Sequence, residues 1–188
     1  MSVAGPTLTS VSTSFPADPD SVERADADLL GSELDNLVQF LDYHRQTFVR
    51  KCAGLDEEQL KRRAAPPSTL SLLGLARHLS DVERHWFVLS LDGRDVPDRY
   101  SSGDDPDGDF DDLDSIPVAE VWANYRAEVT ESRRILATFS SPDDRVRGTG
   151  RRGNRTVRWV LLHLIEEYAR HNGHADLLRE AIDGETGE

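Results

Sequence analysis

Cysteine is nearly absent from this sequence, since Cys52 is the only one among 188 residues. A single thiol excludes an internal disulfide framework and a metal site built from cysteines alone, and it suits a reducing compartment. No apolar run approaches the roughly 20 residues that a membrane-spanning helix needs. Residues 1–22 contain neither a basic cluster nor a continuous apolar run, so we interpret them as a flexible leader and residues 23–188 as one domain. We therefore expect a cytoplasmic protein with no membrane partner.

Positive charge is also scarce, because the sequence has 22 Lys and Arg residues but 35 Asp and Glu residues, which gives a formal net charge of −13. Such a charge repels phosphate backbones, which argues against nucleic acid as a partner. Basic side chains do gather in one short segment between acidic helices. They are Arg145, Arg147, Arg151, Arg152 and Arg155. We interpret them as balancing nearby carboxylates, with a small-anion site as the alternative.

Residues 93–117 are rich in Asp, Gly, Pro and Ser and show no sustained hydrophobic period, which predicts a long surface connection. An EF-hand calcium loop needs Gly at its sixth position and Glu at its twelfth. Neither the frame that begins at Asp105 nor the one that begins at Asp109 supplies both. We interpret this acidic run as a solvated loop.

Apolar residues recur at helical spacing in four segments, which we predict to be helices. The segments are residues 30–54, 72–93, 118–139 and 156–183. Gly184 is the expected cap of the last one. No segment shows the alternation of a strand, so the predicted fold class is all-α. Amphipathic helices of this length, joined by two long connections, bury their apolar faces together as a four-helix bundle.

The last predicted helix carries an unusual polar stripe. His163, Glu167, His171 and His174 follow one another at steps of four, four and three, so they share one face. This face lies beside the apolar one, which places several of the four toward the interior. Buried polar groups need partners, and a metal ion would satisfy a carboxylate and two imidazoles together.

The second predicted helix offers a further ligand, His78, beside its apolar stripe, and His85 lies two turns further along the same side. Glu167 and His171 place two donors about one turn apart, and a third donor from a facing helix leaves a coordination position open. This mixed nitrogen and oxygen set occurs in catalytic zinc sites. Spacing alone is equally compatible with histidines that are hydrogen-bonded in the core, so both interpretations stay open at this point.

Two longer motifs extend the interpretation. They are LSLLGLARHLSDVERHWF in the second predicted helix and RWVLLHLIEEYARHNGHADLLREAIDG in the last. Together with GLDEEQLKRRAAPPS after the first helix, they make residues 26–188 resemble the DinB-like family of metal-binding four-helix bundles, in the subgroup similar to mycothiol-dependent transferases and maleylpyruvate isomerases. The resemblance implies long crossover connections between the helices and frequent homodimers.

The resemblance also implies that a divalent metal is held by His78, Glu167 and His171. We expect zinc. Many members have His where this chain has Glu167, and because a carboxylate suits harder ions as well as zinc, nickel, iron and manganese are the alternatives. We interpret the remaining histidines near this set, His85 and the two others on the polar stripe, His163 and His174, as supporting or pocket residues.

A metal with an open position can deprotonate a bound thiol. We interpret Cys52 as a small buried hydrophobe, so the thiol comes from outside, and the resemblance implies mycothiol or a similar low-molecular-weight thiol. The first hypothesis is therefore a metal-dependent S-transferase acting on an electrophilic small molecule. Two alternatives are a metal-dependent hydrolase with water as nucleophile and a non-catalytic metal-binding stress-response protein, in which the ion only ties helices together.

We make two further predictions about how the interior is packed. We predict that Trp86, Trp122 and Trp159 are core residues without a role in the site, because aromatic side chains at helical spacing usually pack inward. Gly173 lies within the last predicted helix, where glycine is costly. We predict that it permits the close approach of another helix or of a ligand.

Overall fold

The computed structural model describes residues 21–148 and 154–186. Every regular element in these ranges is helical, apart from a single antiparallel bridge between Arg145 and Thr156. The all-α prediction is confirmed for this part of the chain. Residues 1–20 of the predicted leader, together with Arg151 and Arg152 of the basic segment, lie outside the described residues.

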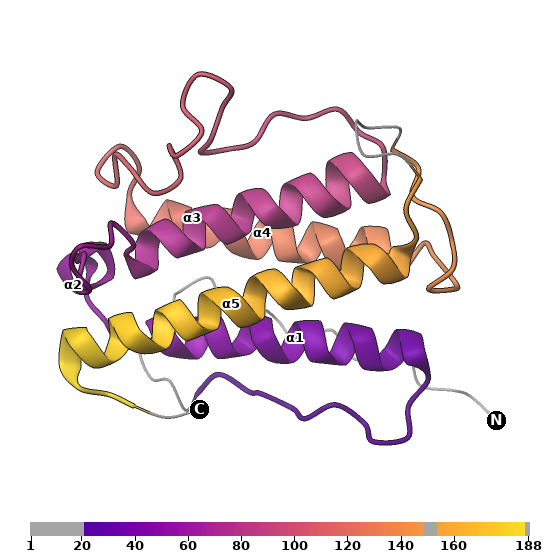
Figure 1. The fold of residues 1–188 in the computed structure, drawn as a ribbon, viewed down its shortest axis with the longest axis horizontal. Coiled ribbons are helices and arrows are strands. Elements are labelled where there is room, and N and C mark those ends of the chain that lie inside the picture. Colours follow the sequence, from indigo (N-terminus) through magenta and orange to yellow (C-terminus); the bar gives the residue numbers. More distant parts are fainter. Residues whose placement is uncertain (1–20, 149–153, 187–188) are drawn as a thin grey trace.

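The described residues form four long helical segments and one short helix (Figure 1). In chain order they are α1 (Glu33–Cys52), α2 (Glu57–Lys61), α3 (Leu72–Glu83) with its continuation η2 (Arg84–Leu91), α4 (Val118–Leu136) and α5 (Val157–Asp183). Helix α5 packs against α1 and α3, and α4 packs against α3 and η2. None of the helices in the described ranges is long and apolar enough to cross a membrane. Neither α2 nor the π-helical character of η2 was predicted from the sequence.

Side-chain caps determine where the two helices that carry the candidate site begin. The Ser71 hydroxyl accepts a hydrogen bond from the Gly74 backbone N–H (3.1 Å) at the start of α3, and the Thr156 hydroxyl accepts one from the Trp159 N–H (3.4 Å) at the start of α5. Gly184 ends α5 in the left-handed conformation with a φ of 80°, as predicted. Helix α5 therefore has a fixed start and a fixed end, with the polar stripe between them.

The predicted start of the first helix was wrong by three residues. Helix α1 begins at Glu33, because the Ser32 hydroxyl caps it by accepting a hydrogen bond from the Asp35 N–H. Leu30 lies before this cap and is 94% exposed. Its apolar character continued the helical pattern in the sequence, but the cap excludes it from the helix.

The core lies between the four long segments. Each contributes a fully or almost fully buried large side chain, among them Phe48 from α1, Leu79 from α3, Trp122 from α4 and Tyr168 from α5. Burial of such a side chain stabilises the fold by about 1.5–3 kcal/mol relative to exposure. Cys52 is also fully buried, so its interpretation as a small core residue is confirmed.

A buried charge also lies in this core. Glu83 of α3 is fully buried, and both of its oxygens accept hydrogen bonds from the guanidinium of Arg45 on α1, at 2.8 and 2.7 Å. The Tyr168 hydroxyl of α5 donates to the same carboxylate at 2.7 Å. A buried carboxylate needs such partners. The network joins α1, α3 and α5 at one level of the fold.

The prediction that Trp159 is buried was wrong, and so was the prediction that another helix approaches Gly173 closely. Trp159, in the first turn of α5, is 42% exposed although its ring lies 5.2 Å from that of Trp86, whereas Trp122 and Trp86 are buried as predicted. A Cβ atom added at Gly173 would meet no atom within 4 Å among the described residues. This glycine is exposed and no close approach of the described chain depends on it.

Candidate metal centre

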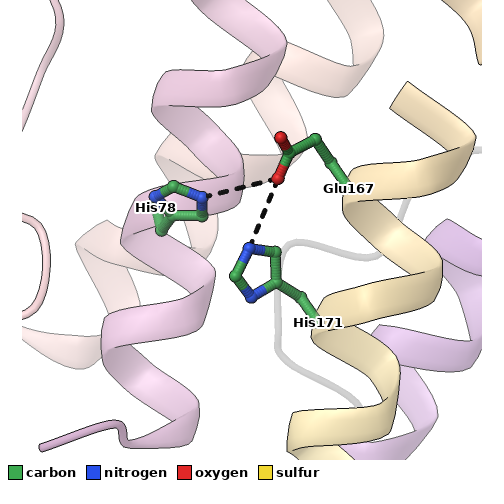
Figure 2. A group of neighbouring side chains, drawn as sticks. All are labelled: His78, Glu167 and His171. Atoms are coloured by element: carbon green, nitrogen blue, oxygen red, sulfur yellow. Dashed lines mark ion pairs between the residues drawn. The ribbon is translucent and has the colours of Figure 1, made fainter. Parts of the chain in front are cut away.

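Three of the predicted ligands lie together between α3 and α5 (Figure 2). Glu167 Oε2 is 3.4 Å from His171 Nε2 and 4.0 Å from His78 Nε2. All three donor atoms lie within 4.8 Å of one another. Glu167 and His171 are one turn apart on α5, and His78 faces them from α3, because these two helices pack side by side. His171 is buried, and the other two side chains are partly buried.

A fourth residue, which the sequence reading missed, contacts this group. The carboxylate oxygen Oδ2 of Asp109 lies 2.7 Å from His78 Nδ1, and Asp109 is only 4% exposed. The neighbouring Phe110 ring stacks on the His78 ring, with 5.0 Å between centroids. The interpretation of residues 93–117 as a solvated acidic loop was therefore wrong at this point. An apolar Phe beside Asp109 in an otherwise acidic run is the signal that indicates a buried turn here.

Helix α3 holds this loop in place from two positions. The Arg77 guanidinium donates to the backbone carbonyl of Gly108 at 2.8 Å and to those of residues 111–112 at 2.9 and 3.0 Å. The Asp81 carboxylate accepts hydrogen bonds from the backbone N–H groups of residues 99–101, at 2.7 to 3.0 Å. Charge-assisted hydrogen bonds of this kind are among the stronger ones in proteins. They fix the loop where Asp109 reaches His78.

The charges around the three donors favour a cation between them. The neighbouring His171 and His78 rings hold the pKa of the Glu167 carboxyl well below its usual range. Burial opposes protonation of His78, but the contacts with Asp109 and Glu167 outweigh it and raise its pKa to about 9. A proton on His78 and a divalent ion satisfy the same two carboxylates, so metal binding would release a proton.

The donor set fits a divalent metal. Two neutral imidazoles and one carboxylate are ligands that zinc and similar ions take, at about 2.0–2.2 Å from each donor. Separations of 3.4 and 4.0 Å between the donor atoms are within reach of one shared ion. Because Asp109 contacts Nδ1 of His78, the Nε2 atom remains available on the side of Glu167 and His171.

A comparison with known proteins identifies the family of this chain. A family model described as Mycothiol-S-transferase matches residues 36–184. The chain belongs to this mycothiol S-transferase family. The match covers nearly all of α1 and the whole of the other helices, and it confirms the resemblance that the sequence motifs indicated. No protein in a search of curated sequences matches this one.

In this mycothiol S-transferase family member, two of the supporting histidines each contact one of the proposed ligands on α5. His163 Nε2 lies 3.4 Å from Glu167 Oε1, the oxygen that faces away from His78. His174 Nδ1 lies 3.3 Å from His171 Nδ1, so the two rings share a hydrogen. Burial lowers the pKa of His174, and the charges of His171 and Arg170 lower it further. Both histidines therefore adjoin the centre.

His85 is placed differently. It is exposed on η2, and its ring packs edge-on against Trp86 at 5.1 Å. The Trp86 ring also contacts the His163 ring, at 4.5 Å, and the Arg155 guanidinium lies 4.8 Å from the Trp86 ring. This aromatic cluster continues the polar stripe of α5 toward its N-terminal end. In the basic segment, Arg147 pairs with Asp92 at 2.9 Å, which agrees with the interpretation that it balances carboxylates.

Proposed function

We propose that this chain is a metal-dependent S-transferase that joins the sulfur of mycothiol, or of a similar low-molecular-weight thiol, to an electrophilic small molecule. One observation carries the proposal. In a chain of the mycothiol S-transferase family, donor atoms of His78, Glu167 and His171 lie within 4.8 Å of one another. Family membership supports the thiol, and the donor cluster supports the metal.

The three residues would hold a divalent cation, zinc first, with nickel, iron or manganese as alternatives. The cation would supply Lewis acidity that favours the deprotonated form of an external thiol at neutral pH. Around it, Glu167 and Asp109 contribute two negative charges that offset the charge of the ion. The two imidazoles stay neutral as ligands, and their second nitrogens contact Asp109 and His174.

The chain does not supply the sulfur itself. Cys52 is fully buried near the end of α1, and burial raises the pKa of its thiol far above the ordinary range. A buried, protonated thiol is a poor nucleophile. The reacting thiol must therefore enter from solvent, lose its proton to the medium and form a bond from sulfur to the electrophilic carbon. The leaving group then departs with its bonding electrons, or an opened ring takes up a proton.

The setting of this reaction forms part of the proposal. We place it in the cytoplasm, where a reduced thiol pool persists, which suits the single buried cysteine. The four long helices form a bundle of the DinB-like type, supported by the packing of α5 on α1 and α3 and of α4 on α3. We also propose a homodimer, as the family resemblance implies. Sedimentation velocity of the purified protein tests the dimer, and a single species at the monomer mass contradicts it.

The experiment that tests the function measures conjugation of monochlorobimane by the purified protein. We expect conjugation to require both mycothiol and metal, to fall on chelation and to return when zinc is restored. Equal rates before and after verified metal removal would contradict metal dependence. Metal-dependent cleavage of activated esters without any thiol would replace the transferase with the hydrolase alternative.

A further inference from the structure

Asp109 is a buried carboxylate in a loop whose neighbouring carboxylates are exposed. It is only 4% exposed, whereas its neighbours at positions 107 and 111 are exposed. Its Oδ1 atom has no hydrogen-bond partner among the described residues. The burial of a charged group is costly unless a partner compensates. The contact of Oδ2 with His78 Nδ1, at 2.7 Å, is the compensation that the structure provides.

This contact determines which nitrogen of His78 is available. A carboxylate only accepts hydrogen bonds, so Nδ1 of His78 carries the hydrogen. In the neutral ring, Nε2 then holds the lone pair, on the side of Glu167 and His171. The Phe110 ring stacks on the same imidazole with an interplanar angle of 26°. The two adjacent loop residues thus restrain both the tautomer and the plane of the ring.

We infer that Asp109 is a positioning residue of the metal centre, and that metal binding is coupled to the docking of residues 107–112 on α3. The inference rests on the metal centre proposed above. A carboxylate behind a ligating histidine raises the basicity of that ligand and fixes its orientation. Such coupling is reciprocal. If docking of the loop raises the affinity for the metal by some factor, bound metal raises the equilibrium constant for docking by the same factor.

The loop has anchors that do not depend on Asp109. Arg77 holds the backbone carbonyls of residues 108, 111 and 112, and Asp81 holds the N–H groups of residues 99–101. Loss of the Asp109 side chain therefore leaves the course of the loop in place. This separation allows a test in which the fold and the ligand His78 remain intact.

The first measurement is the affinity of the full chain for Zn²⁺ and Co²⁺, by competition with a chromophoric chelator. Asp109→Ala should weaken binding by about 10–100-fold, the usual effect of losing a group that supports a metal ligand. Asp109→Asn should lose less metal affinity, because the amide oxygen of Asn can still accept a hydrogen bond from His78 Nδ1. The control is Asp111→Asn, which removes one charge from the same loop at an exposed residue paired with Arg63. It should leave the affinity unchanged.

The second measurement is hydrogen exchange of the loop amides with and without zinc. In the unmodified chain, zinc should slow exchange in residues 107–112. In Asp109→Ala, at zinc concentrations that saturate the site, this protection should be lost, while residues 99–101 exchange as before. Thermal unfolding without metal verifies that the variant is folded. The visible spectrum of bound Co²⁺ should also change in Asp109→Ala, since it reports the orientation of the ligands.

The possible outcomes distinguish failure of the positioning role of Asp109 from failure of the metal centre itself. Unchanged affinity and unchanged protection in Asp109→Ala would overturn the positioning role while leaving the centre intact. Equal losses in Asp109→Ala and Asp111→Asn would assign the effect to loop charge and would also overturn it. If the unmodified chain binds no metal through His78, the metal centre fails, and the inference fails with it.

Discussion

Tyr168 donates a hydrogen bond of 2.7 Å to Glu83 and thereby joins α5 to α3 beside the candidate metal centre. Tyr168 directly follows Glu167 in the chain, and Glu83 lies five residues after His78. The two residues that make this bond are both fully buried. The bond therefore fixes the spacing of the two helices at the level where the donor atoms must meet.

Removal of this hydrogen bond should weaken the fold. Tyr168→Phe should lower the free energy of unfolding by about 1.5–3 kcal/mol, because the bond has a charged acceptor. Glu83→Ala should cost more, about 3–5 kcal/mol, since the buried guanidinium of Arg45 loses both hydrogen bonds to Glu83 and keeps only its contact with Asp42, at 2.9 Å. Urea unfolding followed by circular dichroism measures both. A Tyr168→Phe variant with the same unfolding midpoint and slope as the unmodified chain would show that the hydroxyl contributes nothing.

Loss of one carboxylate should empty the metal centre. Purified protein should hold about one divalent ion per chain, and Glu167→Gln should lose most of it because the amide keeps the volume but removes the ligand charge. Glu180→Gln is the matched control, since Glu180 is an exposed carboxylate further along α5. Elemental analysis of both variants decides the matter. Equal metal content in the two would exclude Glu167 as a ligand.

The helices and the core could be predicted from the sequence because they depend on periodicity. Apolar spacing located the four long segments, and Gly184 marked the end of the last one. The errors arose where a local interaction overrides the pattern. The Ser32 cap excludes Leu30 from α1. Trp159 lies in the first turn of α5 and is 42% exposed, which its helical spacing did not indicate.

The candidate site was predictable in part for the same reason. Glu167 and His171 share a face by spacing alone, and the position of His78 beside an apolar stripe offered it as a ligand from a facing helix. The family resemblance then singled out this set, and the structure brings all three residues together. Asp109 could not be found in this way. Asp109 is 31 residues away from His78 in the sequence. It reaches His78 because the Arg77 side chain donates hydrogen bonds to backbone carbonyls of the irregular loop. Such contacts have no sequence period.

The stability of the fold should fall at alkaline pH through Cys52. Burial raises the pKa of this thiol from an ordinary value of 9.0. Below that pH both the folded and the unfolded chain keep the proton, so the full stability is present. Above it only the unfolded chain releases the proton, so the free energy of unfolding falls as pH rises.

Comparison with Cys52→Ala isolates this contribution. Between pH 8 and pH 10.5, the unmodified chain should lose more stability than the variant, as measured by urea unfolding at each pH. Ionisation of other groups affects both proteins equally and cancels in the difference. Parallel curves for the two proteins would contradict the expected effect of burial on the thiol.

Cys52→Ser should leave thiol-dependent conjugation nearly unchanged. Cys52 is fully buried on α1, whereas the candidate metal centre lies between α3 and α5, so the serine variant alters neither the donors nor their supports. In the native chain, Cys52 should also resist alkylation by iodoacetamide and react only after unfolding, because the reagent needs an accessible thiolate. The test compares monochlorobimane conjugation by the two proteins at equal metal content. Loss of conjugation in a folded, metal-loaded Cys52→Ser protein would overturn the external-thiol mechanism and assign the nucleophile to the chain.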